Sequence, residues 1–174
     1  MKKRVITLLL LPALLAAAIV SCDDDDPTGP SNITYTATLT NANELPNAQG
    51  NKPNTGATGT WSGVLNPTTN VLTWTLSFTG LSANSTGAHI HAQAPTTANA
   101  GIVLNFATFA GGNFATGTTS GNFGGTVSMT SGVVTGLSIT GDSLRKAMDA
   151  GQAYVNVHSG NWTGGEIRGQ VVKQ

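Results

Sequence analysis

The sequence predicts an all-β domain: an antiparallel Greek-key sandwich or flattened barrel of about eight strands, with one short helix in a connection. Three observations support this fold class. Only 9% of the residues are charged and 22 are glycine, while Thr, Ser and Asn are frequent, as in extracellular β proteins. Apolar residues alternate with Thr and Ser over short segments, the period of a half-buried strand. Clusters of Gly, Pro and Asn separate these segments and predict turns.

The N-terminus has the features of an export signal. Three basic residues precede a 16-residue apolar stretch (5–20), which is short for a membrane span, and Cys22 follows closely as the only cysteine of the chain. This junction resembles a bacterial lipobox. We therefore expect residues 1–21 to be a lipoprotein signal peptide and lipid chains on Cys22 to anchor the protein in a membrane. The alternative is an ordinary signal peptide with a chance cysteine or free thiol.

Residues 22–32 form an acidic, Pro/Gly-rich tether. Four aspartates and then Pro-Thr-Gly-Pro-Ser cannot bury apolar surface, so a solvated, extended spacer is expected. An acidic run after a lipidated cysteine resembles the surface-export signal of some bacterial lipoproteins. The sequence thus predicts attachment in the cell envelope, with outer-membrane surface exposure favoured over a periplasm-facing anchor. The run could also serve only to keep the tether soluble.

The remaining residues, 33–174, form one β domain. A first strand is expected from Ile33, and Asn66 to Asn70 predict the turn of a hairpin between strands 61–65 and 71–81. In the second arm, apolar residues from Leu72 to Phe78 alternate with Thr and Ser, so they share a core-facing side, and Trp61 and Trp74 are core candidates. Further strands are expected at 88–93, 102–106, 122–130, 133–139, 154–158 and 166–172.

One segment follows a helical period instead. Asp142 can cap a short helix in which Leu144, Ala147 and Met148 lie on one face, and Gly151 can end it.

The charges of the domain exclude one class of partner. From Ile33 onward there are five basic and four acidic residues, with no basic patch that could follow a phosphate backbone. Nucleic-acid binding is therefore not expected. The domain also lacks cysteine, which excludes disulfides, thiolate metal sites and a cysteine nucleophile.

Three histidines form the candidate site. His89 and His91 are two residues apart on a predicted strand and therefore project from the same face. His158 lies at the end of another predicted strand, on which Asn156 should point the same way. If residues 159–165 close a hairpin, His158 lies opposite Glu166 and Asn156 opposite Arg168, which gathers these polar groups on one outer face.

Two interpretations of this group remain open. Two imidazoles at i, i+2 and a third from another strand can bind copper, zinc or nickel, with Asn156, Glu166 and Arg168 around the ligands. Alternatively, the histidines are structural, and the polar groups form a network that fixes the strand ends.

Four motifs resemble the CHRD domain, which is named for its repeats in chordin. They are Asn-Glu-Leu-Pro (43–46), Gly-Ala-His-Ile-His (87–91), Gly-Gln-Ala-Tyr-Val-Asn-Val-His (151–158) and Gly-Gly-Glu-Ile-Arg-Gly-Gln (164–170). The resemblance covers residues 35–172, although Asn47 stands where the family usually has a second proline. It implies an envelope or extracellular module.

A weaker resemblance concerns copper/zinc superoxide dismutases. His89 and His91, then His158, then a Gly-rich turn leading to Arg168 are similar in order to three copper ligands and an anion-guiding arginine. The bridging histidine and the zinc ligands have no counterpart here. This resemblance implies a superoxide-dismutase-like fold more than a dismutase activity.

The sequence therefore favours a lipid-anchored, non-enzymatic binding or structural module with an extracellular protein or glycan partner. It contains no Gly-x-Ser-x-Gly motif and no carboxylate pair placed for acid–base chemistry. The alternative is a copper- or zinc-binding protein, with a redox role open to it, that uses His89, His91 and His158. Trp162, near His158, either stacks on a sugar or protein partner or covers the end of the sandwich.

Overall fold

The computed structural model describes residues 29–132 and 134–174. The predicted signal peptide, Cys22 and most of the tether lie outside these residues. The described chain is mostly β, with one α-helix and one short 3-10 helix. The elements are β1 (Ile33–Thr40), η1 (Asn41–Asn43), β2 (Thr58–Asn66), β3 (Val71–Thr79), β4 (Ser85–Ala92), β5 (Ile102–Asn105), β6 (Gly121–Ser128), α1 (Gly141–Asp149), β7 (Ala153–Ser159), β8 (Ile167–Gln170) and β9 (Val172–Lys173).

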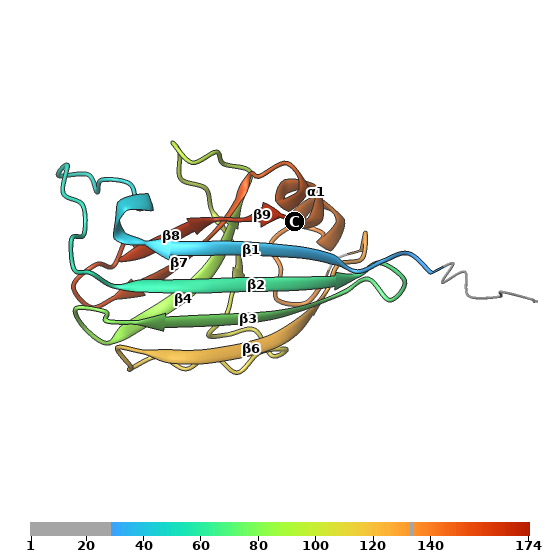
Figure 1. The fold of residues 1–174 in the computed structure, drawn as a ribbon, viewed down its shortest axis with the longest axis horizontal. Coiled ribbons are helices and arrows are strands. Elements are labelled where there is room, and N and C mark those ends of the chain that lie inside the picture. The colour runs from blue at the N-terminus through green and yellow to red at the C-terminus, as the bar shows by residue number, and fades with distance from the viewer. Residues whose placement is uncertain (1–28, 133) are drawn as a thin grey trace, which may run out of the picture.

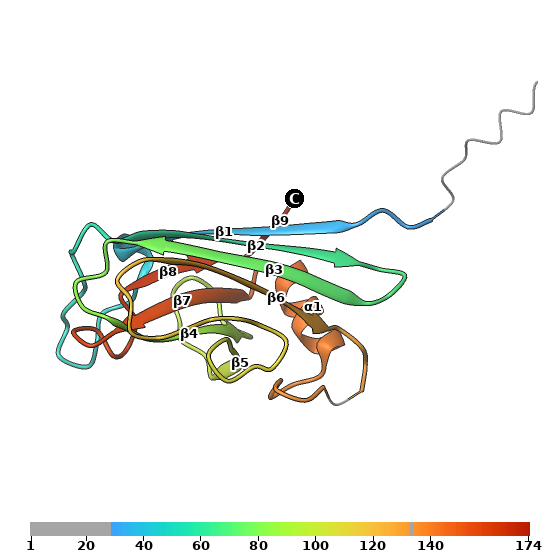
Figure 2. The same cartoon turned by 90° about the horizontal axis from the view of Figure 1, so that it is seen from below.

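The strands form one antiparallel sheet that curls over the core, which agrees with the predicted all-β sandwich. Its order is β5-β4-β7-β8-β1-β2-β3-β6, and β9 pairs with β1 outside this path. Figure 2 shows two layers: β1, β2, β3 and β6 above, and β8, β7, β4 and β5 below, with α1 near one end. β4 follows β3 in sequence but pairs with β7 in the opposite layer. The strand after the hairpin therefore crosses from one layer to the other.

The β2–β3 hairpin agrees with the sequence prediction. Asn66 Oδ1 accepts hydrogen bonds from the backbone N–H groups of Thr68 and Thr69, and Asn70 has φ 52°, a left-handed conformation that asparagine tolerates. The predicted apolar side of β3 faces the core, where Leu72, Trp74, Leu76 and Phe78 are all buried. In Figure 1, β3 lies between β2 and β6. The residues that alternate with its core positions, mainly Thr and Ser, are partly or fully exposed.

The helix also forms where expected, with its cap two residues earlier. Thr140, rather than Asp142, is the N-cap, and its hydroxyl accepts the Ser143 N–H at 3.2 Å. Gly151, at φ 66°, follows the C-terminal end and supplies the left-handed residue that often ends a helix. Leu144, Ala147 and Met148 are buried against the sheet.

The strand predicted at 133–139 does not form in its described part. Residues 134–139 are turns and bends, with a single bridge from Leu137 to Leu104. Gly136 has φ 91°, which interrupts an extended backbone. Val134, Leu137 and Ile139 still pack against the core, so burial explains their apolar character without strand pairing.

Among the described residues, no helix combines the length and the apolar character that crossing a membrane requires.

Candidate functional site

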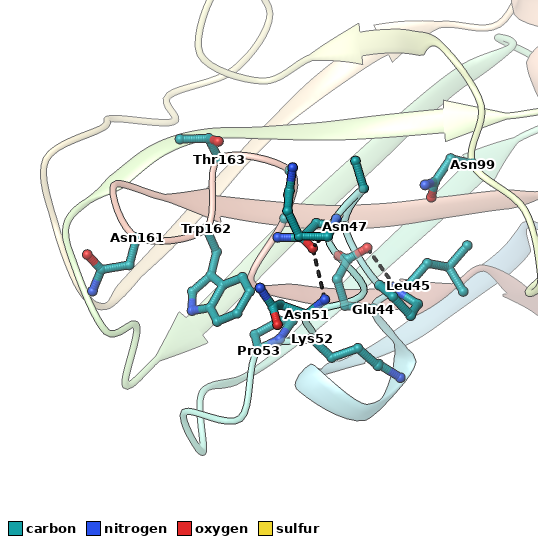
Figure 3. Close-up of a pocket in the computed structure, with 15 residues that line it drawn as sticks. Glu44, Leu45, Asn47, Asn51, Lys52, Pro53, Asn99, Asn161, Trp162 and Thr163 are labelled. Carbon is teal, nitrogen blue, oxygen red and sulfur yellow. Dashed lines mark hydrogen bonds between the residues drawn. The ribbon is translucent and has the colours of Figure 1, made fainter.

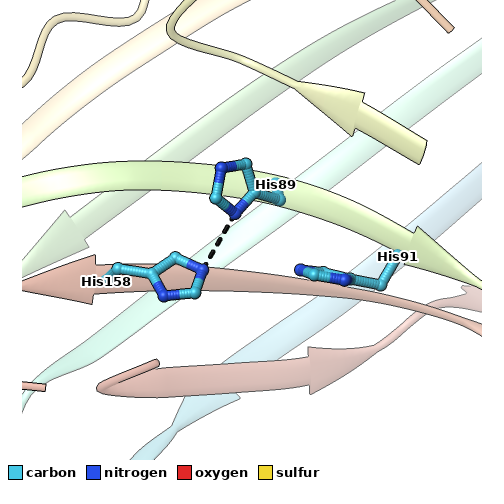
Figure 4. A group of neighbouring side chains, drawn as sticks. All are labelled: His89, His91 and His158. Carbon is cyan, nitrogen blue, oxygen red and sulfur yellow. Dashed lines mark hydrogen bonds between the residues drawn. The ribbon is translucent and has the colours of Figure 1, made fainter. Parts of the chain in front are cut away.

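The three histidines converge on the outer side of the lower layer. His89 and His91 project from β4, and His158 projects from the neighbouring β7. Antiparallel pairing sets His89 opposite Asn156 and Gly87 opposite His158. Figure 4 shows the three rings gathered over these two strands, with the His91 ring edge directed toward the other two.

Their nitrogens are close enough for one ion. His89 Nδ1 lies 2.9 Å from His158 Nε2, and one nitrogen from each of the three rings lies within 4.8 Å of the others. Metal–nitrogen bonds of about 2.0–2.1 Å at tetrahedral angles set ligand nitrogens roughly 3.3 Å apart. The widest separation therefore exceeds this value by at most about 1.5 Å, which side-chain rotation can absorb.

Backbone carbonyls fix the tautomers of two rings. His91 Nδ1 donates to the Ala100 carbonyl at 2.9 Å, and His158 Nδ1 donates to the Thr163 carbonyl at 2.8 Å. A proton on Nδ1 leaves the Nε2 lone pair free to accept a hydrogen bond or bind a metal. His158 Nε2 then accepts from His89 Nδ1. Carbonyl partners of this kind are the usual outer contacts of metal-binding histidines.

The site holds its rings neutral. Burial lowers the pKa of His89 to about 4, and the neighbouring His158 and His91 act in the same direction. Burial is also the main cause that lowers the pKa values of His91 and His158. At neutral pH all three imidazoles are therefore unprotonated at one nitrogen, the form that binds metal ions.

An aromatic and cationic stack supports His91. Its ring lies parallel to that of Tyr154, with the centroids 4.6 Å apart and a 4° angle between the planes. The guanidinium carbon of Arg168 lies 3.5 Å from the centre of the Tyr154 ring. Arg168 also donates to Asn99 Oδ1 and to the carbonyls of Pro95 and Ala98, and thereby ties the loop that covers His91. Tyr154 was not among the predicted site residues, although its spacing of two from Asn156 indicates the same face.

Of the other residues predicted around the histidines, Asn156 lies beside His91 and Glu166 lies elsewhere. Asn156 pairs with Arg168 across β7 and β8 as expected, and Asn156 Oδ1 lies 3.2 Å from His91 Nε2. The Glu166 carboxylate instead accepts hydrogen bonds from Thr55 and Ser82, and it is not a hydrogen-bond partner of the three histidines.

The predicted outer face of these strands is covered rather than open to solvent. His91, Asn156, Glu166 and Arg168 are all at most 7% exposed, because loops fold over the lower layer. His89 and His158 remain partly exposed, so solvent reaches the centre from one side.

Comparison with known proteins adds a family. The profile described as the CHRD domain matches residues 35–171, a span that includes every histidine of the site. Neither the curated proteins nor the solved structures contain a match to this chain.

Proposed function

The chain belongs to the CHRD domain family, and from that premise we propose that it is a non-enzymatic module whose domain binds a zinc or copper ion through His89, His91 and His158. Family membership supports the role of a module. The observation that carries the metal proposal is the convergence of three imidazole nitrogens within 4.8 Å of one another.

The donor set fits these ions. Three neutral imidazoles suit zinc and copper, whereas calcium and magnesium prefer oxygen ligands. Three protein ligands leave a coordination position for water or an external group. Because His89 and His158 are partly exposed, an ion reaches the site without opening the core.

Asn156 supports a cation at this point. When His91 carries its proton on Nδ1, Nε2 and the facing Asn156 Oδ1 are both acceptors, only 3.2 Å apart. Two facing acceptors repel each other unless the amide turns or a proton or metal ion lies near them. Asn156 is therefore either an oxygen donor to the ion or a group that orients His91.

Metal content of the purified protein tests the proposal. After exposure to zinc or copper and removal of excess ion, we expect about one equivalent by mass spectrometry. His89→Gln and His158→Gln should each lower retention strongly. Replacement of Asp23 to Asp26 by serine is the control, because an acidic tether can hold cations without a built site. Metal that follows the aspartates rather than the histidines would contradict the proposal.

We further propose that lipid on Cys22 anchors the module in the cell envelope, at the outer-membrane surface. Ten residues separate Cys22 from Ile33, so an extended tether allows a reach of roughly 33 Å at about 3.3 Å per residue. Labelling with a fatty-acid probe should mark the wild type and not Cys22→Ser. Protease digestion of intact cells then distinguishes surface exposure, in which the domain is lost, from a periplasm-facing anchor, in which it is protected.

A further inference from the structure

A second concave site lies next to the histidine centre and shares with it the loop that contains Thr163. It is a groove of about 700 Å³ between the loop from Glu44 to Pro53 and the loop from Asn161 to Gly165, with Asn99 from a third loop. Figure 3 shows the two loops facing each other, with Trp162 and Asn161 on one side and Asn47 and Asn51 near the other. The groove thus joins the Asn-Glu-Leu-Pro motif to Trp162, neither of which the metal centre uses.

Glu44 is the unusual group in its lining. The residue is only 5% exposed, Oε1 accepts the Leu45 N–H at 3.1 Å, and the buried Oε2 has no hydrogen-bond partner among the described residues. Burial raises the pKa of this carboxyl group, against smaller opposite effects of the Leu45 N–H, Arg168 and Lys52. A buried carboxylate oxygen without a donor is destabilising, so Oε2 favours either its own protonation or a donor that enters the groove, such as a ligand hydroxyl.

The opposing loop is shaped to accommodate this carboxylate. Gly165 has φ 130°, and a Cβ atom there would collide with Glu44 Oε2. Any larger residue would displace the carboxylate from the groove.

Three asparagine amides in the lining each have one polar atom held by a hydrogen bond, while the other polar atom is available to a ligand. Asn47 Oδ1 accepts the backbone N–H groups of Gln49 and Asn51, and Asn99 Oδ1 accepts from Arg168. Asn161 is held by its Nδ2, which donates to Ser82. Asn47 and Asn99 therefore offer Nδ2 donors, and Asn161 offers an Oδ1 acceptor, each in an orientation set before a ligand arrives.

Trp162 supplies an apolar surface beside these polar groups. It is partly exposed and lines the groove, whereas Trp61 and Trp74 are each only 1% exposed in the core. A flat indole face next to hydrogen-bonding groups can cover the C–H face of a sugar ring while the hydroxyls of the ring meet the amides.

The charge of the lining narrows the ligand class. Glu44 and Lys52 are its only ionisable residues, so neither a polyanion nor a polycation is favoured. The lining residues lie in loops and include five amide side chains, so the groove offers no strand edge of the kind by which extended peptides are usually bound. We infer that this groove binds a neutral oligosaccharide, with Trp162 stacked on a sugar ring, Glu44 accepting from sugar hydroxyls, and the three amides setting orientation.

Tryptophan fluorescence of the full-length protein tests this inference. The probes are neutral hexasaccharides of the β-glucan, chitin, mannan and xylan types, with heparin and an unstructured peptide as the competing classes. Because Trp61 and Trp74 are buried, we expect saturable changes that come from Trp162. Binding should survive a chelator and the variant His89→Gln, whose ring has no hydrogen bond to the groove loops, so failure of the metal proposal leaves this result unaffected.

Variants then locate the ligand. Trp162→Ala should weaken binding about tenfold or more, measured by calorimetry since this variant lacks the reporter. Glu44→Gln should weaken it roughly 10- to 100-fold, and Asn99→Ala about two- to tenfold. Asn122→Ala, an exposed amide on β6 outside the groove, should leave affinity unchanged. Thermal unfolding confirms that each variant is folded.

The outcomes separate clearly. Binding of a neutral hexasaccharide that is lost in both Trp162→Ala and Glu44→Gln establishes the groove as a glycan site. No binding by any of the four saccharides at millimolar concentration, binding only of heparin or the peptide, or binding that both variants retain overturns the inference.

Discussion

The two layers of the sheet differ in what lies on their outer faces. In the upper layer, β1, β2 and β3 alternate between buried apolar side chains and outward Thr and Ser, and Ser62 and Thr75 meet there by a hydrogen bond of 2.8 Å. In the lower layer, the outward positions of β7 and β8 carry Tyr154, Asn156 and Arg168, which are buried under loops. The same strand period therefore gives a solvated surface in one layer and a second, polar interior in the other.

This difference shows where function can be built. A solvated outer face leaves side chains mobile, whereas a loop-covered face holds His91, Asn156 and Arg168 in fixed positions by hydrogen bonds and stacking. Both proposed sites lie at the covered layer, and the loop that contains Trp162 and Thr163 serves both: its Thr163 carbonyl orients His158, and its side chains line the groove.

The largest expected effect comes from removing the Arg168 side chain, which holds the loop over His91 in place. Arg168→Ala deletes three hydrogen bonds to the loop that covers His91. Asn99 Oδ1 and the Ala98 carbonyl lose their donor, whereas the Pro95 carbonyl still accepts the Ala98 N–H. We expect a loss of about 3–5 kcal/mol in the free energy of unfolding, measured by denaturant titration. The stability of Arg168→Lys should lie between those of the wild type and Arg168→Ala, because a lysine ammonium cannot reproduce the planar, forked set of donors of a guanidinium. A loss below about 1 kcal/mol for Arg168→Ala would show that the loop is held by other contacts.

Alanine substitutions at two glycines test how tightly the loops over the lower layer are packed. Gly165 and Gly56 both have positive φ, at 130° and 77°, but a Cβ at Gly165 meets Glu44 and Asn156 whereas nothing lies within 4 Å at Gly56. Gly165→Ala should cost about 2–4 kcal/mol in the free energy of unfolding, and Gly56→Ala about 1 kcal/mol from backbone strain alone. Equal costs would mean that the loop moves away freely, and that the covered face is less rigid than its contacts indicate.

Local patterns allowed much of this molecule to be predicted from the sequence. The hairpin turn depends on Asn66 and its neighbours. The alternation in β3 depends on residues two positions apart, and the same spacing places His89 and His91 on one face. The covering of the lower layer depends on contacts between segments far apart, such as Arg168 with Asn99, which no local period encodes. For the same reason Glu44, which lies beside Gly165 from the other end of the chain, was not a predicted site residue.

A smaller effect with a characteristic pH dependence is expected at Glu44. Burial raises the pKa of this carboxyl group in the folded state, so its protonation favours folding. Its contribution is most favourable below the unfolded-state pKa and is lost as the pH rises through the folded-state pKa. Glu44→Gln should therefore unfold at a higher temperature than the wild type at pH 7, with the difference shrinking toward pH 4. A variant that is less stable than the wild type at pH 7 would show that the charged carboxylate is satisfied in the free protein.

The smallest effect is expected on the open face of the upper layer. Thr75→Ala removes an exposed hydroxyl and its hydrogen bond with Ser62, and should change the free energy of unfolding by no more than about 0.5 kcal/mol. A double-mutant cycle with Ser62→Ala measures the pair alone, and a coupling of roughly 0.2–0.5 kcal/mol is expected for exposed hydroxyls on facing strands. An exposed hydroxyl pair alone does not contribute more than about 1.5 kcal/mol. A larger cost for Thr75→Ala would therefore indicate that this face is also covered, for example by a second copy of the chain. Repeating the measurement at tenfold lower protein concentration identifies such a partner, because only an intermolecular contribution weakens on dilution.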